Sequence, residues 1–356
     1  MRSLSILQLC IFCIAVCGFH RRISTKLRVV PHDSRFFSRE VSLRAVWSNP
    51  QAVEDYQNYL DGVEEQVSKD QPSVFVAGSD RRLAEGLASF GFGKDVVISS
   101  IKELPASVDG LTDFPIYACV APMDLEQLIL DCPEAKRPDL VFLQTGMMEP
   151  LLKRYGLCGK RNTQALCYFE FHPMSGKPID YVMNLGLDQQ GNDKLAAVTS
   201  VCGKWAGAMT QRLTRNNIYC EAVGYYEWRR VMLERVLFET IFSLVGALHK
   251  DSTFGEVGLY YKDEVEEMWT DFNRCIRGHL AVTMLYGVEE RFYAIAESFQ
   301  RHGDRRRAIG DDWPFFHGYW MEVDRMYTSK GLDPPVPMWR EYMDYGVYKN
   351  IFTLPS

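Results

Sequence analysis

Apolar positions follow two different patterns along this chain, and the pattern changes near residue 194. In the first part, short apolar runs bounded by turn residues alternate with segments of helical periodicity. Strands are expected over residues 73–77, 95–101, 115–121, 139–146, 165–171 and 180–186, with helices over 81–91 and 124–130. Apolar strands that alternate with helices predict a parallel sheet with helices on both faces.

From residue 194 onward, segments of helical periodicity follow one another directly. They cover residues 194–215, 221–249, 256–277, 278–302 and 313–330. The segment 221–249 is apolar on nearly every side in its second half, and such a helix is normally buried on every side. Arg235 and Glu239 limit its uncharged run to about ten residues, which is too short to cross a membrane. This segment is therefore expected to be the central helix of an all-helical domain.

These patterns divide the chain into regions. The sheet domain is expected over residues 48–193, beginning with an amphipathic helix at 50–69, and the all-helical domain over 194–332. Residues 333–356 begin with Pro334, Pro335 and Pro337 and continue with a series of aromatic residues, which predicts an aromatic tail packed on the body. The predicted fold class is α/β: a parallel-sheet domain followed by an all-helical C-terminal domain.

The first 47 residues have the composition of targeting segments. Residues 1–18 hold an early arginine and then an apolar stretch that ends in small residues, the pattern of a secretory signal peptide. Residues 19–47 are rich in arginine and hydroxyl residues and poor in acids, as plastid transit peptides are. The two in series resemble the bipartite presequences of algae with plastids of secondary origin, so the plastid stroma is the expected location. A secreted protein with a basic propeptide is the alternative.

The net charge of −6 conceals an asymmetry between these segments and the rest of the chain. Residues 1–47 hold eight lysines and arginines and two acids, which leaves 32 basic and 44 acidic residues from residue 48 onward. A body with a net charge of about −12 is unfavourable for binding nucleic acid or an anionic membrane surface.

Cysteine and histidine positions predict no disulfide framework and no metal site. Seven cysteines lie beyond the N-terminal apolar run, and none of them is in C-x-x-C spacing. Buried free thiols are therefore expected. The seven histidines show no pairing at i, i+4.

The turn after the first expected strand, VFVAGSDRRL, is a candidate dinucleotide-binding loop of the Rossmann type. Such a loop uses three glycines, but only Gly78 is present, with Asp80 at the second position, where a carboxylate repels phosphate. Side-chain donors and the following helix N-terminus would have to replace them. Ser99 and Lys102 follow the second strand, where an acid would hold the ribose of NAD, so NADP is the expected dinucleotide. The candidate cofactor-binding residues are Gly78, Ser79, Arg81, Arg82, Ser99, Lys102 and Gln144.

Three longer segments carry a resemblance to a known family. They read LQTGM at 143–147, YYEWRRVMLERVLFETIFSLVGALH at 225–249 and FFHGYWMEVDRMYTSKGL at 315–332. In order and spacing they resemble the ketopantoate reductases, an offshoot of the 6-phosphogluconate dehydrogenase-like superfamily, over about residues 73–342. The resemblance implies a Rossmann-like domain followed by an all-helical domain, and reduction of a small 2-oxo acid with NADPH.

The resemblance also implies the candidate catalytic residues. In Gln144-Thr145-Gly146-Met147, Thr145 stands where the family has an active-site asparagine. In the central helix the family's general-acid lysine falls on Arg230 and a following asparagine on Glu234, and the substrate-binding glutamate falls on Asp312. An arginine keeps its proton far above neutral pH, so Arg230 would clamp a carboxylate but donate protons poorly. Alternatively, Arg230 and Glu234 form a packed ion pair one helical turn apart.

Two functions follow as alternatives. The first is a reductase that binds a small oxo acid between Thr145, Arg230 and Asp312. The second is a non-catalytic scaffold or assembly protein whose amphipathic helix and aromatic tail bind an unknown protein partner. A cleft open between the domains would favour the reductase, and a cleft filled by aromatic side chains would favour the scaffold. Homodimerisation through the helical domain is compatible with both.

Overall fold

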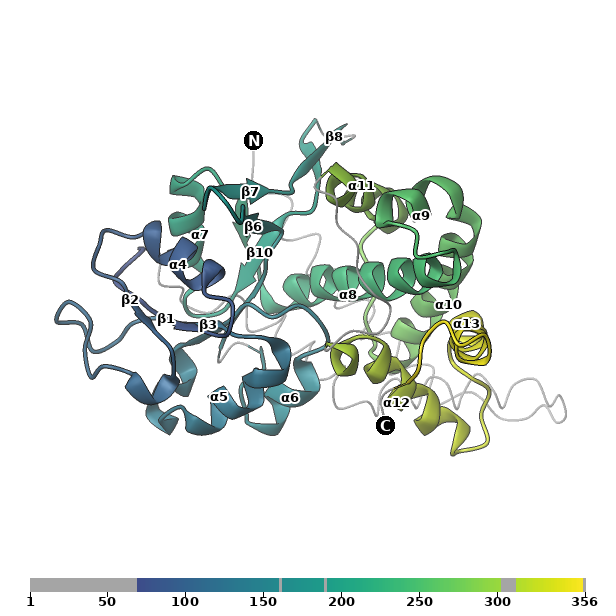
Figure 1. Cartoon of the computed structure of the whole chain (residues 1–356), viewed down its shortest axis with the longest axis horizontal. Coiled ribbons are helices and arrows are strands. Elements are labelled where there is room, and N and C mark those ends of the chain that lie inside the picture. Colours follow the sequence, from purple (N-terminus) through teal and green to yellow (C-terminus); the bar gives the residue numbers. More distant parts are fainter. Residues whose placement is uncertain (1–68, 160–161, 189–190, 302–311, 355–356) are drawn as a thin grey trace, which may run out of the picture. The chain divides into compact units, whose positions relative to one another are not determined.

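The computed structural model describes residues 69–159, 162–188, 191–301 and 312–354 (Figure 1). The expected signal peptide, the transit-like segment and nearly all of the amphipathic helix at 50–69 lie outside these residues. In the described part of the chain, no helix is both long and apolar enough to cross a membrane.

A seven-stranded sheet forms the first half of the described chain, in the order β11-β10-β5-β4-β3-β1-β2. Strands β2, β1, β3, β4 and β5 run parallel, β10 is antiparallel to β5, and β11 is parallel to β10. The bounds are β1 Val74–Ala77, β2 Val96–Ile98, β3 Ile116–Cys119, β4 Leu140–Phe142, β5 Thr163–Leu166, β10 Thr199–Cys202 and β11 Cys220–Ala222. Two hairpins, β6–β7 (Phe169–Phe171 and Pro178–Asp180) and β8–β9 (Met183–Leu187 and Asp193–Ala196), lie between β5 and β10 in the sequence.

Both faces of the sheet are covered, because successive side chains of each strand point to opposite faces. On one face, Phe75 and Tyr117 pack against helices α4 (Arg82–Ser89) and α7 (Ala206–Arg215). On the other face, the alternate strand residues pack against α5 (Leu125–Asp131) and α6 (Glu149–Arg154). The prediction of an α/β sheet with two covered faces is confirmed.

Three sequence-based predictions for the segments between residues 165 and 215 are wrong in detail. The helix expected over 194–215 begins only at Ala206, because residues 199–202 are the buried strand β10 between β5 and β11. The sheet thus continues past residue 193 and is not wholly parallel. The strands expected over 165–171 and 180–186 each split into two, since the chain leaves the large sheet after Leu166 to form the hairpins. Strands β5 and β10 pair antiparallel, and an antiparallel pair needs no helical crossover, so the two hairpins can form the connection between them.

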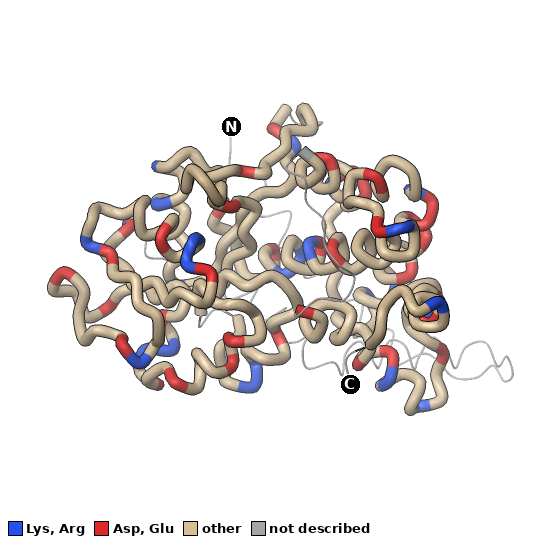
Figure 2. Tube along the Cα trace, viewed as in Figure 1, with Lys and Arg blue, Asp and Glu red and all other residues tan. Residues whose placement is uncertain are grey.

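The second half of the described chain is helical, as predicted, but the helix expected over 221–249 begins at Tyr225 and the one expected over 278–302 begins at Val288. Its helices are α8 (Tyr225–Leu248), α9 (Phe254–Tyr260), α10 (Lys262–His279), α11 (Val288–Arg301), α12 (His317–Thr328) and α13 (Pro337–Tyr348). The central α8 is buried on all sides from Met232 to Gly246, and its charged residues Arg235 and Glu239 pair with each other at 2.5 Å. Acidic positions gather along α10 (Figure 2).

The aromatic tail is a helix rather than an irregular segment. Helix α13 packs Trp339 and Met343 into the helical core beside Phe272 and Trp320. Its other side leaves Tyr348 exposed. The seven cysteines of the described residues are free, and five of them are buried, as the sequence predicted.

Candidate functional site

Gly78 directly follows strand β1 and lies close to the end of β3. Its backbone N–H donates to Cys119 O at 3.0 Å. A Cβ at this position would lie 3.2 Å from Val120 Cα, which is tighter than most Cβ contacts. The glycine therefore brings the ends of β1 and β3 together, whether or not a phosphate group is bound near it.

The carboxylate of Asp80 occupies the N-terminus of α4. It accepts a hydrogen bond from the Arg82 backbone N–H at 2.9 Å and from Arg82 Nε at 2.9 and 3.0 Å. These bonds to Arg82 lower the pKa of Asp80, so the carboxyl group is ionised at neutral pH. An anion-binding helix end uses free N–H groups and a positive potential, and Asp80 engages one of these N–H groups and adds a negative charge beside the helix end.

The other expected phosphate-binding residues have partners of their own. Arg81 donates from Nε to Glu85 at 2.8 Å and from Nη1 to Ser99 Oγ at 2.9 Å, which brings a guanidinium to the end of β2. Lys102 forms an ion pair with Asp131 at 3.3 Å. Ser79 is exposed, and Arg82 is held by Asp80. Of the predicted set, the structure thus joins Arg81 with Ser99 directly.

Gln144 and Thr145 lie just after strand β4. Gln144 Nε2 donates to Ala118 O at 2.7 Å and to Val120 O at 3.0 Å, so the side chain ties β4 to the end of β3. Thr145 is half-buried beside it. The described hydrogen bonds thus give Gln144 a structural role at this edge of the sheet.

Gly146 and Phe315 are in close contact at the same end of the sheet, just after β4. Gly146 has φ of 121°, and a Cβ there would lie 2.7 Å from Phe315 Cβ. The next residue, Met147, donates its N–H to Phe315 O at 2.7 Å. Phe315 comes from the turn Trp313–Phe315 before α12, and Asp312 begins this turn by accepting from Phe315 N. The segment that carries Asp312 therefore packs directly on the loop that carries Thr145.

The first turns of α8 present arginines with two different partners. Arg229 is buried and donates to Glu149 at 3.0 Å, and Glu149 also pairs with Lys153 at 2.9 Å. Burial opposes ionisation of Glu149, but these two cations lower its pKa. Arg230 instead donates to Tyr226 Oη at 3.1 Å and lies over the Tyr226 ring at 4.5 Å.

The expected ion pair between Arg230 and Glu234 is not formed. Glu234 accepts two hydrogen bonds of 2.7 Å from Nε and Nη2 of Arg291 on α11. Burial raises the pKa of Glu234 above its usual value, although Arg291 acts in the opposite direction. A planar guanidinium that approaches with two nitrogens offers a better geometry than the neighbouring arginine on the same helix. Nothing in the local sequence identifies Arg291 as this partner, because it lies 57 residues away.

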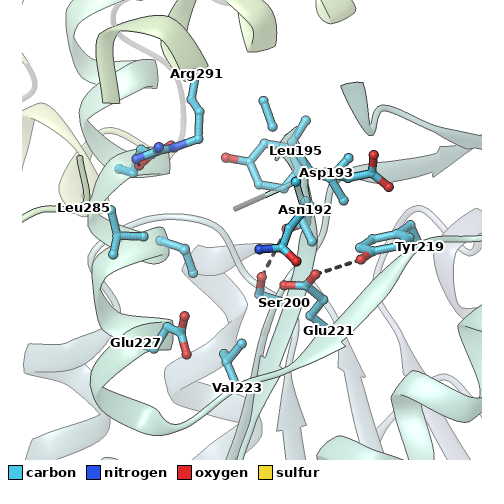
Figure 3. A pocket seen from close by; sticks show the side chains of 17 residues that line it. Asn192, Asp193, Leu195, Ser200, Tyr219, Glu221, Val223, Glu227, Leu285 and Arg291 are labelled. Carbon is cyan, nitrogen blue, oxygen red and sulfur yellow. Dashed lines mark hydrogen bonds and ion pairs between the residues drawn. The ribbon is translucent and has the colours of Figure 1, made fainter. Parts of the chain in front are cut away.

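Glu234 and Arg291 line a pocket of about 670 Å³ between α8, α11 and the strands β9 to β11 (Figure 3). Figure 3 shows Glu227 and Leu285 on one side of the pocket, and Glu221 and Tyr219 on the other. The polar and charged lining residues are Tyr168, Asn192, Asp193, Ser200, Tyr219, Glu221, Glu227, Glu234 and Arg291. Arg230, Thr145 and Asp312 are not among the lining residues. Of the four predicted catalytic residues, the pocket therefore contains Glu234 alone.

The electrostatic character of this pocket is acidic. Asp193, Glu221 and Glu227 are exposed carboxylates, and Glu221 accepts a hydrogen bond from Tyr219 Oη at 2.8 Å. The single cation of the lining, Arg291, is already paired with the buried Glu234. Leu195, Val223, Val231 and Leu285 form apolar parts of the wall. Such a pocket suits a cationic group on an apolar stem.

Comparison with known proteins gives similar folds and no close relative. Neither known protein families nor curated proteins match the sequence. Similar solved structures include 2-dehydropantoate 2-reductase from Methylococcus capsulatus, at 10% identity over 79% of this chain and 98% of that one, with a TM-score of 0.49. They also include a D-mandelate dehydrogenase with NADH, at 11% identity over 78% and 90%, with a TM-score of 0.46.

Structures named ketopantoate or 2-dehydropantoate reductase recur among the similar ones, as the sequence motifs predicted. A dimeric ketopantoate reductase from Staphylococcus aureus matches at 12% identity over 79% of this chain and all of that one, with a TM-score of 0.43. A likeness this distant concerns the arrangement of the chain and assigns no role to any residue.

Proposed function

We propose that this chain is a non-catalytic binding protein that keeps the arrangement of a two-part dehydrogenase. The observation that carries the proposal is the Asp80 carboxylate bound at the N-terminus of α4. A dinucleotide pyrophosphate would need the N–H groups of this helix end, including the Arg82 N–H that Asp80 accepts from, and the same positive potential. It would also approach an ionised carboxylate, which repels it. The chain's own anion thus takes the place that a cofactor phosphate would require.

The residues expected to bind substrate support the same proposal. Phe315 covers Gly146 at the end of β4, where a parallel sheet of this kind binds its ligands. Arg230 lies on Tyr226, and Glu234 is engaged by Arg291. An arginine is also a poor proton donor, and both oxygens of the Glu234 carboxylate accept from Arg291, so neither residue is arranged as a general acid for carbonyl reduction.

The binding site of the proposed function is the acidic pocket of Figure 3. Its exposed carboxylates attract a cation, and its apolar wall accommodates a methylene stem. A lysine or arginine side chain of a protein partner has both parts. We therefore propose a basic segment of a protein as the occupant of this pocket.

Nucleotide binding gives the first test. The protein is titrated with NADPH or NADH, and binding is followed by nucleotide fluorescence. No saturation is expected up to about 1 mM, and a Kd of that size corresponds to a binding free energy of only about −4.1 kcal/mol. Substituting Asp80→Gly frees the Arg82 backbone N–H and removes the repelling charge. This variant is expected to bind NADPH at least about tenfold more tightly than the wild type, a gain of about 1.4 kcal/mol.

Asp109→Gly is the matched control, because it removes the same charge from an exposed loop whose φ of 48° a glycine accepts easily. It should bind no more NADPH than the wild type. Saturable micromolar binding by the wild-type protein would contradict the proposal.

A reductase is the second candidate, favoured by one observation. Arg81 reaches Ser99 at the end of β2, the position at which a 2′-phosphate of NADP would be bound. If the wild type binds NADPH and Arg81→Ala weakens that binding, the chain would be assigned as an NADPH-dependent reductase, and small 2-oxo acids would be screened as substrates.

A cationic peptide tests the pocket. Pentalysine is the probe, and the double variant Glu221→Gln, Glu227→Gln is expected to bind it about tenfold more weakly, because each exposed charge pair contributes up to about 1 kcal/mol. The difference should shrink at high salt. Glu322→Gln on α12 removes an exposed acid outside the pocket and is the control. An equal loss in that variant would show that pentalysine binds the acidic surface in general.

The proposal also includes a location in the cell and an oligomeric state. Import into a plastid rests on the composition of residues 1–47, and self-association rests on the expected helical domain. The first concerns the compartment in which the protein would bind its partner, and the second concerns its oligomeric state. Neither changes the chemistry proposed for it.

A further inference from the structure

A small enclosed cavity lies between the sheet and the start of α8. Its volume is about 10 Å³, near the minimum that one water molecule requires. The lining residues come from β4 and β5, from the loop and helix that follow β4, and from α8: Phe142, Gln144, Gly146, Met148, Glu149, Gln164, Trp228 and Met232. The cavity is separate from the acidic pocket.

Two buried hydrogen-bond donors line this cavity without a partner among the described residues. They are Nε2 of Gln164, a residue 3% exposed, and Nε1 of Trp228, a residue 5% exposed. An unpaired buried donor costs about 1–3 kcal/mol, so native proteins nearly always satisfy such groups, often with an ordered water. The two donors come from different elements, β5 and α8, and share one cavity.

We propose that this cavity holds a single ordered water molecule that accepts hydrogen bonds from Gln164 Nε2 and Trp228 Nε1. The carboxylate of Glu149 lines the same cavity and can accept a hydrogen bond from the water. This set of two donors and one acceptor matches the bonding capacity of water. A halide is larger and would face the Glu149 carboxylate, which disfavours it. The water connects strand β5 to helix α8, and its presence does not depend on what the protein binds.

A crystal structure of the full chain at high resolution tests the site directly. A single density peak within hydrogen-bonding distance of both nitrogens is expected. Absence of a peak, or a peak that refines as an ion rather than as water, would overturn the proposal.

A double-mutant cycle in solution provides a second measurement. Gln164→Met and Trp228→Phe each remove one donor and preserve most of the side-chain volume. Because both donors bind the same water, their effects on the folding equilibrium constant are expected to be non-additive by about fivefold, the size of one ordinary hydrogen bond. Unfolding by urea gives the equilibrium constants.

Trp320→Phe is the matched control for this cycle. Its indole N–H is also buried without a partner in the described structure, but Trp320 lies in the helical core and does not line the cavity. Combined with Gln164→Met, it should be additive. Additivity of Trp228→Phe with Gln164→Met would show that the two donors share no water.

Discussion

Replacing Arg212 with methionine is expected to lower the free energy of unfolding by about 3–5 kcal/mol, because two buried carboxylates would lose their shared cation. Arg212 Nε donates to Asp70 at 2.9 Å and its Nη2 to Asp95 at 3.0 Å, and the three side chains are at most 3% exposed. Asp70 lies shortly before β1 and Asp95 directly before β2. One guanidinium on α7 therefore holds the entries of two strands.

Arg215→Met is the control for this experiment. Arg215 is on the same helix and also pairs with Asp70, at 2.6 Å, but its side chain is 32% exposed. Its loss leaves Asp70 with Arg212, so a cost of at most about 1 kcal/mol is expected. Urea unfolding of both variants gives the two free energies. Similar losses in both would mean that burial of the Arg212 network contributes little.

Acidification below pH 6.5 is expected to destabilise the protein through His317. This histidine begins α12 and is 1% exposed, and burial lowers its pKa to about 3. Trp339 Nε1 donates to Nδ1 at 3.2 Å, so the neutral ring carries its hydrogen on Nε2, beside Ser243 Oγ at 3.2 Å. Protonation at Nδ1 would place two donors against each other inside the core.

The sign of the effect follows from the two pKa values. Between the ordinary value of about 6.5 and the folded value of about 3, the unfolded state binds a proton at His317 and the folded state does not. The stabilisation is thus complete above pH 6.5 and falls by about 1.4 kcal/mol for each pH unit below it.

The measurement is the free energy of unfolding between pH 6.5 and pH 4.5, compared with that of His317→Gln. Glutamine can accept a hydrogen bond from Trp339 and donate one to Ser243, but it does not titrate. The free energy of unfolding of His317→Gln should therefore fall less steeply with decreasing pH than that of the wild type, by about 1.4 kcal/mol for each pH unit. Parallel curves for His317→Gln and wild type would refute the assignment.

The parts of the fold that the sequence predicted are those determined by local pattern. The second half of α8 is apolar on every side, and only burial on every side accommodates such a helix. Strand β10 could not be found in this way. Its residues Thr199–Cys202 follow an apolar stretch that also fits a helix, and pairing with β5 and β11 decides between the two.

The same distinction between local features and contacts of distant segments applies to the candidate site. Asp80 was recognised from the sequence as unfavourable for phosphate, since its position in the loop is a local property. The partner of Glu234 could not be identified from the sequence. Arg230 is the arginine one turn away on the same helix, whereas the actual partner, Arg291, belongs to another helix. Phe315 at Gly146 is likewise a contact between distant segments. Sequence periodicity holds no information about such pairs.

The contact between Met147 and Phe315 also bears on the order in which the chain can fold. It joins a loop of the sheet to the turn before α12, so nearly half of the chain must be arranged before the hydrogen bond forms. Closing so large a loop costs conformational entropy, and this cost arises before the contact can stabilise the structure. Strands β1, β3 and β4 and helix α5 follow one another closely in the sequence and need no such closure. We therefore expect the sealing of the sheet edge to be a late event in folding, after the sheet has formed.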